Sequence, residues 1–134
     1  MGQPCLIEYH GGGAVAGSAE ACNMDMARYA VQCGVTVVNV DYRLAPEHKI
    51  PCGIDDGYAA VKWVIANAEK LGIDGSRIAL MGESGGGLIT GGVSMRLAEA
   101  NEGHLVRFQA QVIPMTTNAF ITKPDSYFDE WELG

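Results

Sequence analysis

The chain has 134 residues, 48% of them hydrophobic and 19% charged, so it is large enough for one domain with a real core and is not a disordered protein. Nine basic and 16 acidic residues give a net charge of −7, which argues against binding to nucleic acid or to an anionic membrane surface. No stretch approaches the roughly 18 uninterrupted apolar residues of a membrane span. The N-terminus shows no signal peptide, and we therefore expect a cytoplasmic protein.

The four cysteines are scattered along the chain, at positions 5, 22, 33 and 52. They form no Cys-x-x-Cys pair, and their spacing is not typical of metal ligands. Because no secretory signal is visible, we expect reduced thiols rather than two disulfides. We also expect no metal site.

The apolar and β-branched runs predict four strands, at residues 5–9, 35–40, 77–81 and 108–113. Helical patterns lie between them, at residues 18–33, 55–71 and 88–100. We expect Asp55 or Asp56 to cap the second helix, and Gly34 and Gly72 to end the first two. This alternation predicts one α/β domain over residues 1–134, with a parallel sheet of about four strands and helices on both faces.

The remaining segments are polar. Residues 41–53 hold two prolines and are too irregular for a long element, and residues 74–76 form a turn before the third strand. The tail, residues 115–134, carries four clustered aromatic residues: Phe120, Tyr127, Phe128 and Trp131. Packing on the surface is the simpler interpretation of this tail, and the start of a cap or of a pocket is the alternative.

A Gly-x-Ser-x-Gly pattern joins the third strand to the third helix, with Ser84 at its centre. A strand, a tight turn of this kind and a helix are the context of a nucleophile elbow, in which the serine hydroxyl stands clear of the sheet. Gly82 and Gly86 fit because side chains there would collide with the strand and the helix. The pattern alone is weak, because 18 glycines in 134 residues produce chance matches, and an ordinary serine in a glycine-rich turn remains the alternative.

Three loops follow the carboxyl ends of the predicted strands: residues 10–13, residues 41–48 and the elbow. A serine nucleophile needs a base, and its tetrahedral intermediate needs hydrogen-bond donors. The uncovered N–H groups of residues 11–13 and of Gly85 can be these donors. No Lys-Ser/Thr pair follows a glycine loop and no Gly-x-Gly begins the elbow, so phosphate-loop and dinucleotide-binding interpretations fail. Acyl transfer without a cofactor fits best.

Three motifs in this order resemble the hormone-sensitive-lipase family of α/β-hydrolases: His10-Gly11-Gly12-Gly13, Asp41-Tyr42-Arg43-Leu44-Ala45-Pro46-Glu47-His48 and Gly82-Glu83-Ser84-Gly85-Gly86. The resemblance covers the chain from Pro4 to about Pro114. It implies an esterase or lipase that cleaves carboxylic esters, as small-molecule substrates, through an acyl-serine intermediate. It further implies that Ser84 is the nucleophile and that the N–H groups of Gly12, Gly13 and Gly85 form the oxyanion hole.

Other residues of these motifs are expected to organise the loops. The resemblance implies a structural role for the segment 41–48, which ends at His48. We expect His10 to order the glycine loop rather than to act as a general base. Glu83 stands where the family more often has aspartate, a departure that we expect to preserve the local hydrogen bonding.

The match lacks a catalytic triad, whose order in this fold is Ser, then Asp or Glu, then His. His104 is the only histidine after Ser84, and we expect it at a helix end, on the surface. Asp125 and Asp129 follow Ser84, but no histidine follows them. The four strands resemble the third to sixth of the family's eight, so that residues 35–40 and 108–113 become edge strands. We expect the chain to be the central part of a hydrolase domain, with little activity alone.

Two further interpretations stay open. The plant gibberellin receptors resemble this family and have lost catalysis while keeping the pocket, so a non-catalytic ligand-binding module is one alternative. An inactive relic on the same scaffold is the other. The intact Ser84, glycine loop and Gly85 favour the enzyme.

Overall fold

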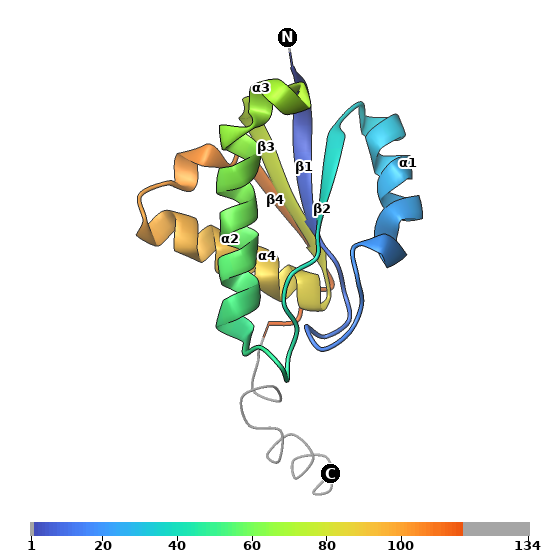
Figure 1. Ribbon diagram of the computed structural model, residues 1–134, viewed down its shortest axis with the longest axis vertical. Helices are drawn as coiled ribbons and strands as arrows, with labels where there is room; N and C mark the ends of the chain where they lie inside the picture. Colours follow the sequence, from blue (N-terminus) through green and yellow to red (C-terminus); the bar gives the residue numbers. More distant parts are fainter. Residues whose placement is uncertain (1, 117–134) are drawn as a thin grey trace, which may run out of the picture.

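The computed structural model describes residues 2–116 of the chain. Within this range the elements, in chain order, are β1 (Gln3–Tyr9), η1 (Glu20–Cys22), α1 (Asn23–Cys33), β2 (Thr36–Val40), α2 (Ile50–Ala66), α3 (Ala68–Leu71), β3 (Ile73–Glu83), α4 (Gly85–Glu99), η2 (Gly103–Leu105) and β4 (Phe108–Val112). The predicted alternation of strands and helices is therefore confirmed (Figure 1). The tail predicted as surface, cap or pocket lies outside the described residues from position 117 onward.

The four strands form one parallel sheet in the order β2-β1-β3-β4. The two central strands, β1 and β3, pair over most of β1, with Ile7 opposite Leu80. As predicted, β2 and β4 are the edges of this sheet. Because all strands run in the same direction, the segments that follow β1, β2 and β3 lie together at the carboxyl ends of the strands.

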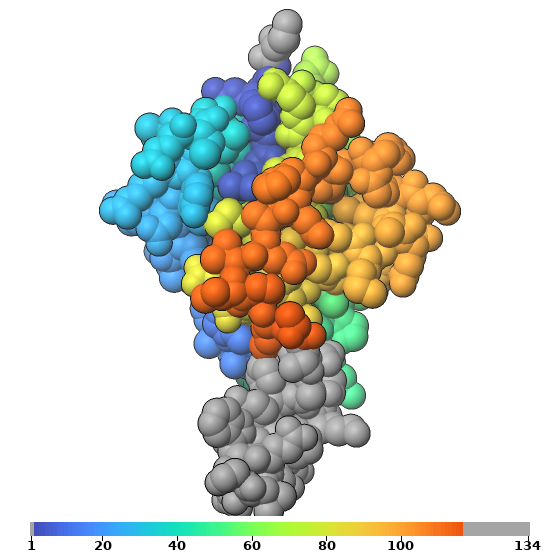
Figure 2. All heavy atoms as spheres, turned by 180° about the vertical axis from the view of Figure 1, so that it is seen from behind, coloured from blue at the N-terminus to red at the C-terminus, as the bar shows by residue number. Residues whose placement is uncertain are grey.

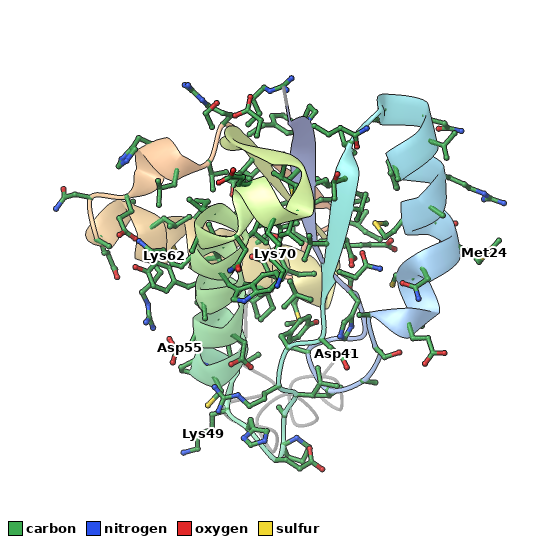
Figure 3. All side chains as sticks on the ribbon, turned by 45° about the horizontal axis from the view of Figure 1, so that its top comes forward. Met24, Asp41, Lys49, Asp55, Lys62 and Lys70 are labelled. Atoms are coloured by element: carbon green, nitrogen blue, oxygen red, sulfur yellow. The ribbon has the colours of Figure 1, made fainter. Side chains whose placement is uncertain are left out.

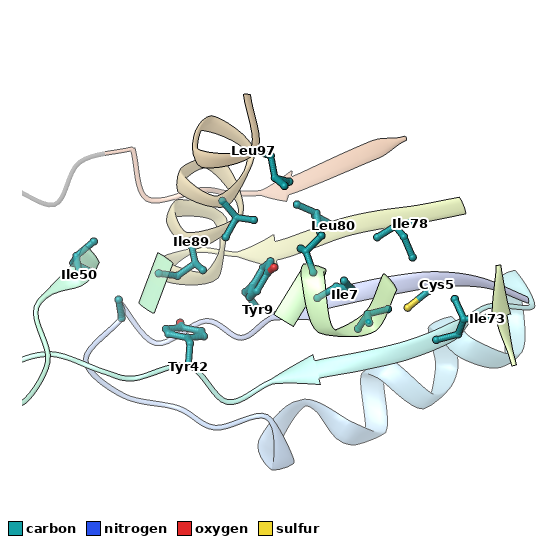
Figure 4. Close-up of a cluster of buried hydrophobic side chains, with 14 residues drawn as sticks. Cys5, Ile7, Tyr9, Tyr42, Ile50, Ile73, Ile78, Leu80, Ile89 and Leu97 are labelled. Atoms are coloured by element: carbon teal, nitrogen blue, oxygen red, sulfur yellow. The ribbon is translucent and has the colours of Figure 1, made fainter. Parts of the chain in front are cut away.

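Alternate residues of the strands face opposite sides of the sheet. On one side, Cys5, Ile7 and Tyr9 of β1 are buried in a core that also holds Leu80 and side chains of α2 and α4 (Figure 4). On the other side α1 packs against β2, so helices lie on both faces as expected. Figure 2, which shows the molecule from behind, has β4 (orange) exposed on this second side between α1 and α4. Phe108 of β4 is 64% exposed.

Helix α2 begins at Ile50, five residues before the predicted caps Asp55 and Asp56, so that prediction was wrong. Lys49 is extended and Pro51 lies in the first turn, where a proline needs no hydrogen-bond donor and its fixed φ suits a helix. The two aspartates lie inside the helix and form ion pairs instead: Asp55, labelled in Figure 3, with Arg96, and Asp56 with Arg43.

Other boundaries also differ from the expectation: β1 begins at Gln3, and the predicted second helix divides into α2 and α3. The predicted first helix divides into η1 and α1, although Gly34 ends it in the left-handed conformation as predicted. The predicted turn at residues 74–76 lies within β3, where Gln3 pairs with Ile73 but Cys5 pairs with Ile78, so the strand bulges. Helix α4 begins at Gly85 rather than at residue 88, directly after Ser84.

No helix in residues 2–116 is both long and apolar enough to cross a membrane.

The buried centre of the sheet should dominate stability. Leu80 is fully buried in β3, so Leu80→Ala removes apolar contacts and leaves a cavity, and we expect a loss of about 2–5 kcal/mol in the free energy of unfolding by urea. Val31→Ala is the matched control, because Val31 is 83% exposed on α1, and its effect should stay within about 0.5 kcal/mol. Equal losses in the two variants would contradict the placement of the core.

Candidate active site

Ser84 forms the turn between β3 and α4 in a backbone conformation that non-glycine residues rarely adopt, with φ 52° and ψ −113°. Such a conformation costs on the order of 1–3 kcal/mol and persists only where the surroundings impose it. Here the Ser84 N–H donates to the Val112 carbonyl at 3.0 Å, and the Ser84 carbonyl accepts from the N–H groups of Gly87 and Met115. The half-buried serine is therefore held at the carboxyl end of the sheet.

The flanking glycines are required by close backbone contacts. A Cβ on Gly86 would collide with the carbonyl groups of Tyr9 and His10, at the end of β1. A Cβ on Gly82 would collide with the Gly86 carbonyl and lie 2.5 Å from the Thr90 hydroxyl oxygen. The elbow can therefore turn this sharply, and lie this close to β1, only with glycine at both positions.

The loop after β1 has three consecutive residues in the left-handed region: Gly12 (φ 115°), Gly13 (φ 65°) and Ala14 (φ 59°). The Gly12 carbonyl accepts hydrogen bonds from Val15 and Ala16. Within residues 2–116, the N–H groups of Gly12 and Gly13 donate no backbone hydrogen bond in this loop. These two donors are available to another acceptor.

The structure brings the predicted oxyanion residues together from two segments about 70 positions apart in the sequence. A Cβ built on Gly85 would lie 2.8 Å from the backbone nitrogen of Gly13 and 2.5 Å from that of Ala14. A Cβ on Gly11 would lie 3.9 Å from the Ser84 Cβ. The glycine loop thus packs directly against the start of α4, where the first N–H groups of the helix have no partner within the helix.

His10 and Tyr42 hold the glycine loop in place. Their rings stack with centroids 4.4 Å apart, and the Tyr42 hydroxyl donates to the His10 carbonyl at 2.6 Å. His10 is 1% exposed, and its Nδ1 lies 2.8 Å from the Gly11 carbonyl oxygen, to which it donates. Its Nε2 lies 3.8 Å from a carboxylate oxygen of Asp41, which Figure 3 labels where β2 ends. This arrangement supports the loop-ordering role expected for His10.

The segment 41–48 is anchored to both sides of the site. The Ala45 N–H donates to the Ala14 carbonyl at 2.9 Å, which joins this segment to the glycine loop. The Arg43 guanidinium binds both oxygens of Asp56 on α2, and these hydrogen bonds hold the pKa of Asp56 below its usual range. His48 lies exposed on this segment, as the structural role predicts.

His104 lies at the opposite end of the sheet from Ser84. It belongs to η2, which precedes β4, whereas Ser84 follows β3, and these strands are parallel. The 15 residues of helix α4 lie between Ser84 and His104 in the chain, and a helix of this length spans about 22 Å at 1.5 Å per residue. The exposed His104 is therefore excluded as the base for Ser84, in agreement with the sequence-based expectation.

Sequence reasoning missed Glu8, a buried carboxyl group beside the elbow. Glu8 is 3% exposed on β1, and its Oε2 has no hydrogen-bond partner among the described residues. Burial, and then the neighbouring charge of Glu83, raise the pKa of Glu8 to about 7. The only signal in the sequence was one acidic residue in an otherwise apolar strand.

Residues 6–132 match a family model described as alpha/beta hydrolase fold. Among curated relatives, Carboxylesterase NlhH of Mycobacterium tuberculosis is 45% identical over 121 residues, which are 90% of this chain and 37% of that protein. Gibberellin receptor GID1B of Arabidopsis thaliana is 40% identical over 116 residues, 84% of this chain and 32% of the receptor.

A solved structure of similar fold is the hyperthermophilic esterase of the archaeon Pyrobaculum calidifontis, with a TM-score of 0.81 and 42% identity. The match covers 84% of this chain and 36% of the esterase. The chain therefore spans about a third of the length of these three proteins.

The buried Glu8 should make stability depend on pH. Its pKa is raised from 4.5 to about 7, so the stabilising effect of its proton is complete below about pH 4.5 and is lost as the pH rises through 7. Glutamine cannot ionise, so Glu8→Gln should gain stability over the original chain between pH 5 and pH 8, by up to about 3 kcal/mol at 1.36 kcal/mol per pKa unit.

Urea unfolding at a series of pH values measures this difference. Glu99→Gln is the control, because Glu99 is exposed at the end of α4, and its difference from the original chain should stay constant over the same range. If the difference in unfolding free energy between Glu8→Gln and the original chain were also constant with pH, the pKa of Glu8 would not be raised.

Proposed function

Because the chain belongs to the α/β-hydrolase family, in the branch that resembles hormone-sensitive lipase, we propose that it carries the nucleophile and the oxyanion hole of a carboxylic-ester hydrolase. The observation that carries the proposal is the contact between two loops. Ser84 is held in the elbow with a positive φ, and the Gly13 backbone nitrogen packs against Gly85 beside it. Tight backbone packing of this kind presents donors to a reacting carbonyl group.

The chemistry follows from this arrangement. The Ser84 hydroxyl oxygen attacks the ester carbonyl carbon, and the carbonyl oxygen becomes an oxyanion that accepts hydrogen bonds from the N–H groups of Gly12, Gly13 and Gly85. Each such donor is worth about 2.7–4 kcal/mol in the transition state. The positive end of the α4 dipole adds to this effect, because Gly85 is the first residue of that helix. The base takes the proton of the Ser84 hydroxyl and gives it to the leaving alcohol, and water then attacks the acyl-serine and releases the acid.

The base for Ser84 is proposed to lie outside these 134 residues. The chain holds three histidines: His10 is bound to the Gly11 carbonyl, His48 is exposed on the segment 41–48, and His104 lies at the far end of the sheet. The histidine and the acidic residue of a triad would then come from elsewhere, as the sequence predicts. The proposed substrate is a small-molecule carboxylic ester, and we further propose a cytoplasmic location.

A receptor-like module is the second candidate, and two observations favour it. One relative carries the name of a gibberellin receptor, and no histidine in residues 2–116 hydrogen-bonds the Ser84 side chain. A pocket that binds without turnover needs neither a base nor a strained nucleophile. The positive φ of Ser84 and the available donors of the glycine loop favour the hydrolase, because binding alone gives no reason for them.

A base added to the solution separates these possibilities. General base catalysis contributes about 10²–10⁴-fold, so the chain alone should hydrolyse p-nitrophenyl acetate slowly, and imidazole should raise the rate by on the order of tenfold or more. Ser84→Ala should lose this imidazole-dependent component, apart from the hydrolysis that imidazole causes without protein. Ser94→Ala, a control on α4, should keep it.

The outcomes are distinct. An equal imidazole response in Ser84→Ala and in the original chain would show that Ser84 is not the nucleophile. Fast turnover without imidazole that Ser84→Ala abolishes would keep the nucleophile and overturn the proposed absence of the base.

A further inference from the structure

A cavity of about 400 Å³ lies on the side of the sheet that α1 partly covers, next to the elbow. Glu8 and Glu83 line it from β1 and β3, and Gly11 lines it from the glycine loop. Register places both carboxyl groups on this side, because Glu8 pairs with Met81 and Glu83 is two residues further along the same strand. Its volume is within the usual range for a small-molecule pocket.

The charge of this cavity is unbalanced. Three acidic residues line it, Glu8, Glu83 and Asp25, and Arg28 is the only basic residue of its lining within the described part of the chain. The Arg28 guanidinium lies 3.5 Å from an oxygen of Asp25, so that pair is neutral. The two glutamates face the cavity without a countercharge in residues 2–116.

One carboxylate oxygen of Glu8 has no hydrogen-bond partner among the described residues. Glu8 is 97% withdrawn from solvent, and a buried carboxyl group that lacks such a partner is costly. Glu8 also lines the cavity, so a ligand there can reach its carboxyl group. A positively charged donor in the cavity would both hydrogen-bond the Glu8 carboxylate and balance its charge.

The lining favours an organic cation over a metal ion. No group of three or more His, Cys, Asp or Glu side chains able to hold a metal is found in residues 2–116. The aromatic ring of Tyr29 and the thioethers of Met26 and Met81 complete the wall. Aromatic rings and carboxylates together attract alkylammonium groups, and the methionines suit their carbon chains.

We propose that this cavity is a binding site for a primary alkylammonium group, held by the Glu8 and Glu83 carboxylates beside the elbow. The site lies between α1 and the central strands. The alkylammonium group can belong to a free amine or to the amino end of a larger ligand. Binding does not require Ser84 to be a nucleophile, and the test below is therefore independent of ester hydrolysis.

Titration of the full chain with n-butylammonium chloride, followed by backbone NMR shifts at constant ionic strength and pH 8, tests the proposal. We expect saturable shifts at residues of β1, β3 and α1 that line the cavity. The neutral isostere n-butanol should bind at least about tenfold more weakly, since it lacks the charge. Glu8→Gln keeps the shape and should weaken n-butylammonium binding to a similar extent, whereas Glu99→Gln at the far end of α4 should bind as the original chain does.

Cys22 offers a second measurement, because it is one of the residues that line the same cavity. A cationic and an anionic methanethiosulfonate of equal size react with the same thiolate, so the ratio of their rates reports the local potential and not the pKa of the thiol. This ratio should be higher at Cys22 than at the exposed Cys33, and Glu8→Gln should lower it only at Cys22.

Three results would overturn the proposal. Equal binding of n-butanol and n-butylammonium would show an apolar cavity only. Unchanged affinity in Glu8→Gln would show that this carboxyl group is not the binding group. If the NMR shifts with n-butylammonium did not saturate, and the cationic-to-anionic rate ratios were equal at Cys22 and Cys33, the cavity would not bind an alkylammonium group.

Discussion

The close contact between the end of β1 and the start of α4 is the constraint on which the site depends. Gly86 lies so near the carbonyl groups of Tyr9 and His10 that no side chain fits between them, and Gly82 lies equally near Gly86. Pairing of β1 with β3 at the centre of the sheet brings these backbones together. The Ser84 conformation and the approach of Gly13 to Gly85 both follow from this contact.

The surrounding structure keeps this contact rigid. Tyr42 stacks on His10 and binds its carbonyl, and Ala45 binds the carbonyl of Ala14, so the segment after β2 fixes the glycine loop from outside. The Arg43–Asp56 pair then joins the same segment to α2. A site that relies on backbone donors needs such support, because a donor displaced by 1 Å no longer stabilises the oxyanion.

The buried Glu8 stands apart from this pattern of satisfied groups. Folded proteins rarely keep a buried carboxyl group without a partner, because a buried polar group without a hydrogen bond costs about 1–3 kcal/mol of stability. Its location two residues before His10, facing away from the core and toward Glu83, places the cost next to the elbow. Unsatisfied polar groups in folded proteins concentrate at functional sites, and this one is explained if a cation completes it.

Local sequence signals predicted most of the fold and the elbow. The β-branched runs and the glycines at positions 34 and 72 act through short-range geometry, so their strands and helix ends were predicted correctly. The start of α2 was not, because Asp55 and Asp56 resemble caps locally but pair with Arg96 and Arg43, which lie elsewhere in the sequence. Glu8 and its cavity were missed for the same reason, since burial and a neighbouring charge arise only after β1 and β3 pair.

The most direct test of the account is a crystal structure of the chain after reaction with an alkyl fluorophosphonate in imidazole buffer. The account predicts a covalent phosphonyl group on the Ser84 oxygen, with one phosphonyl oxygen about 2.7–3.1 Å from the backbone nitrogens of Gly12, Gly13 and Gly85. Phosphonylation of another residue instead of Ser84, or an oxygen turned away from the glycine loop, would contradict it.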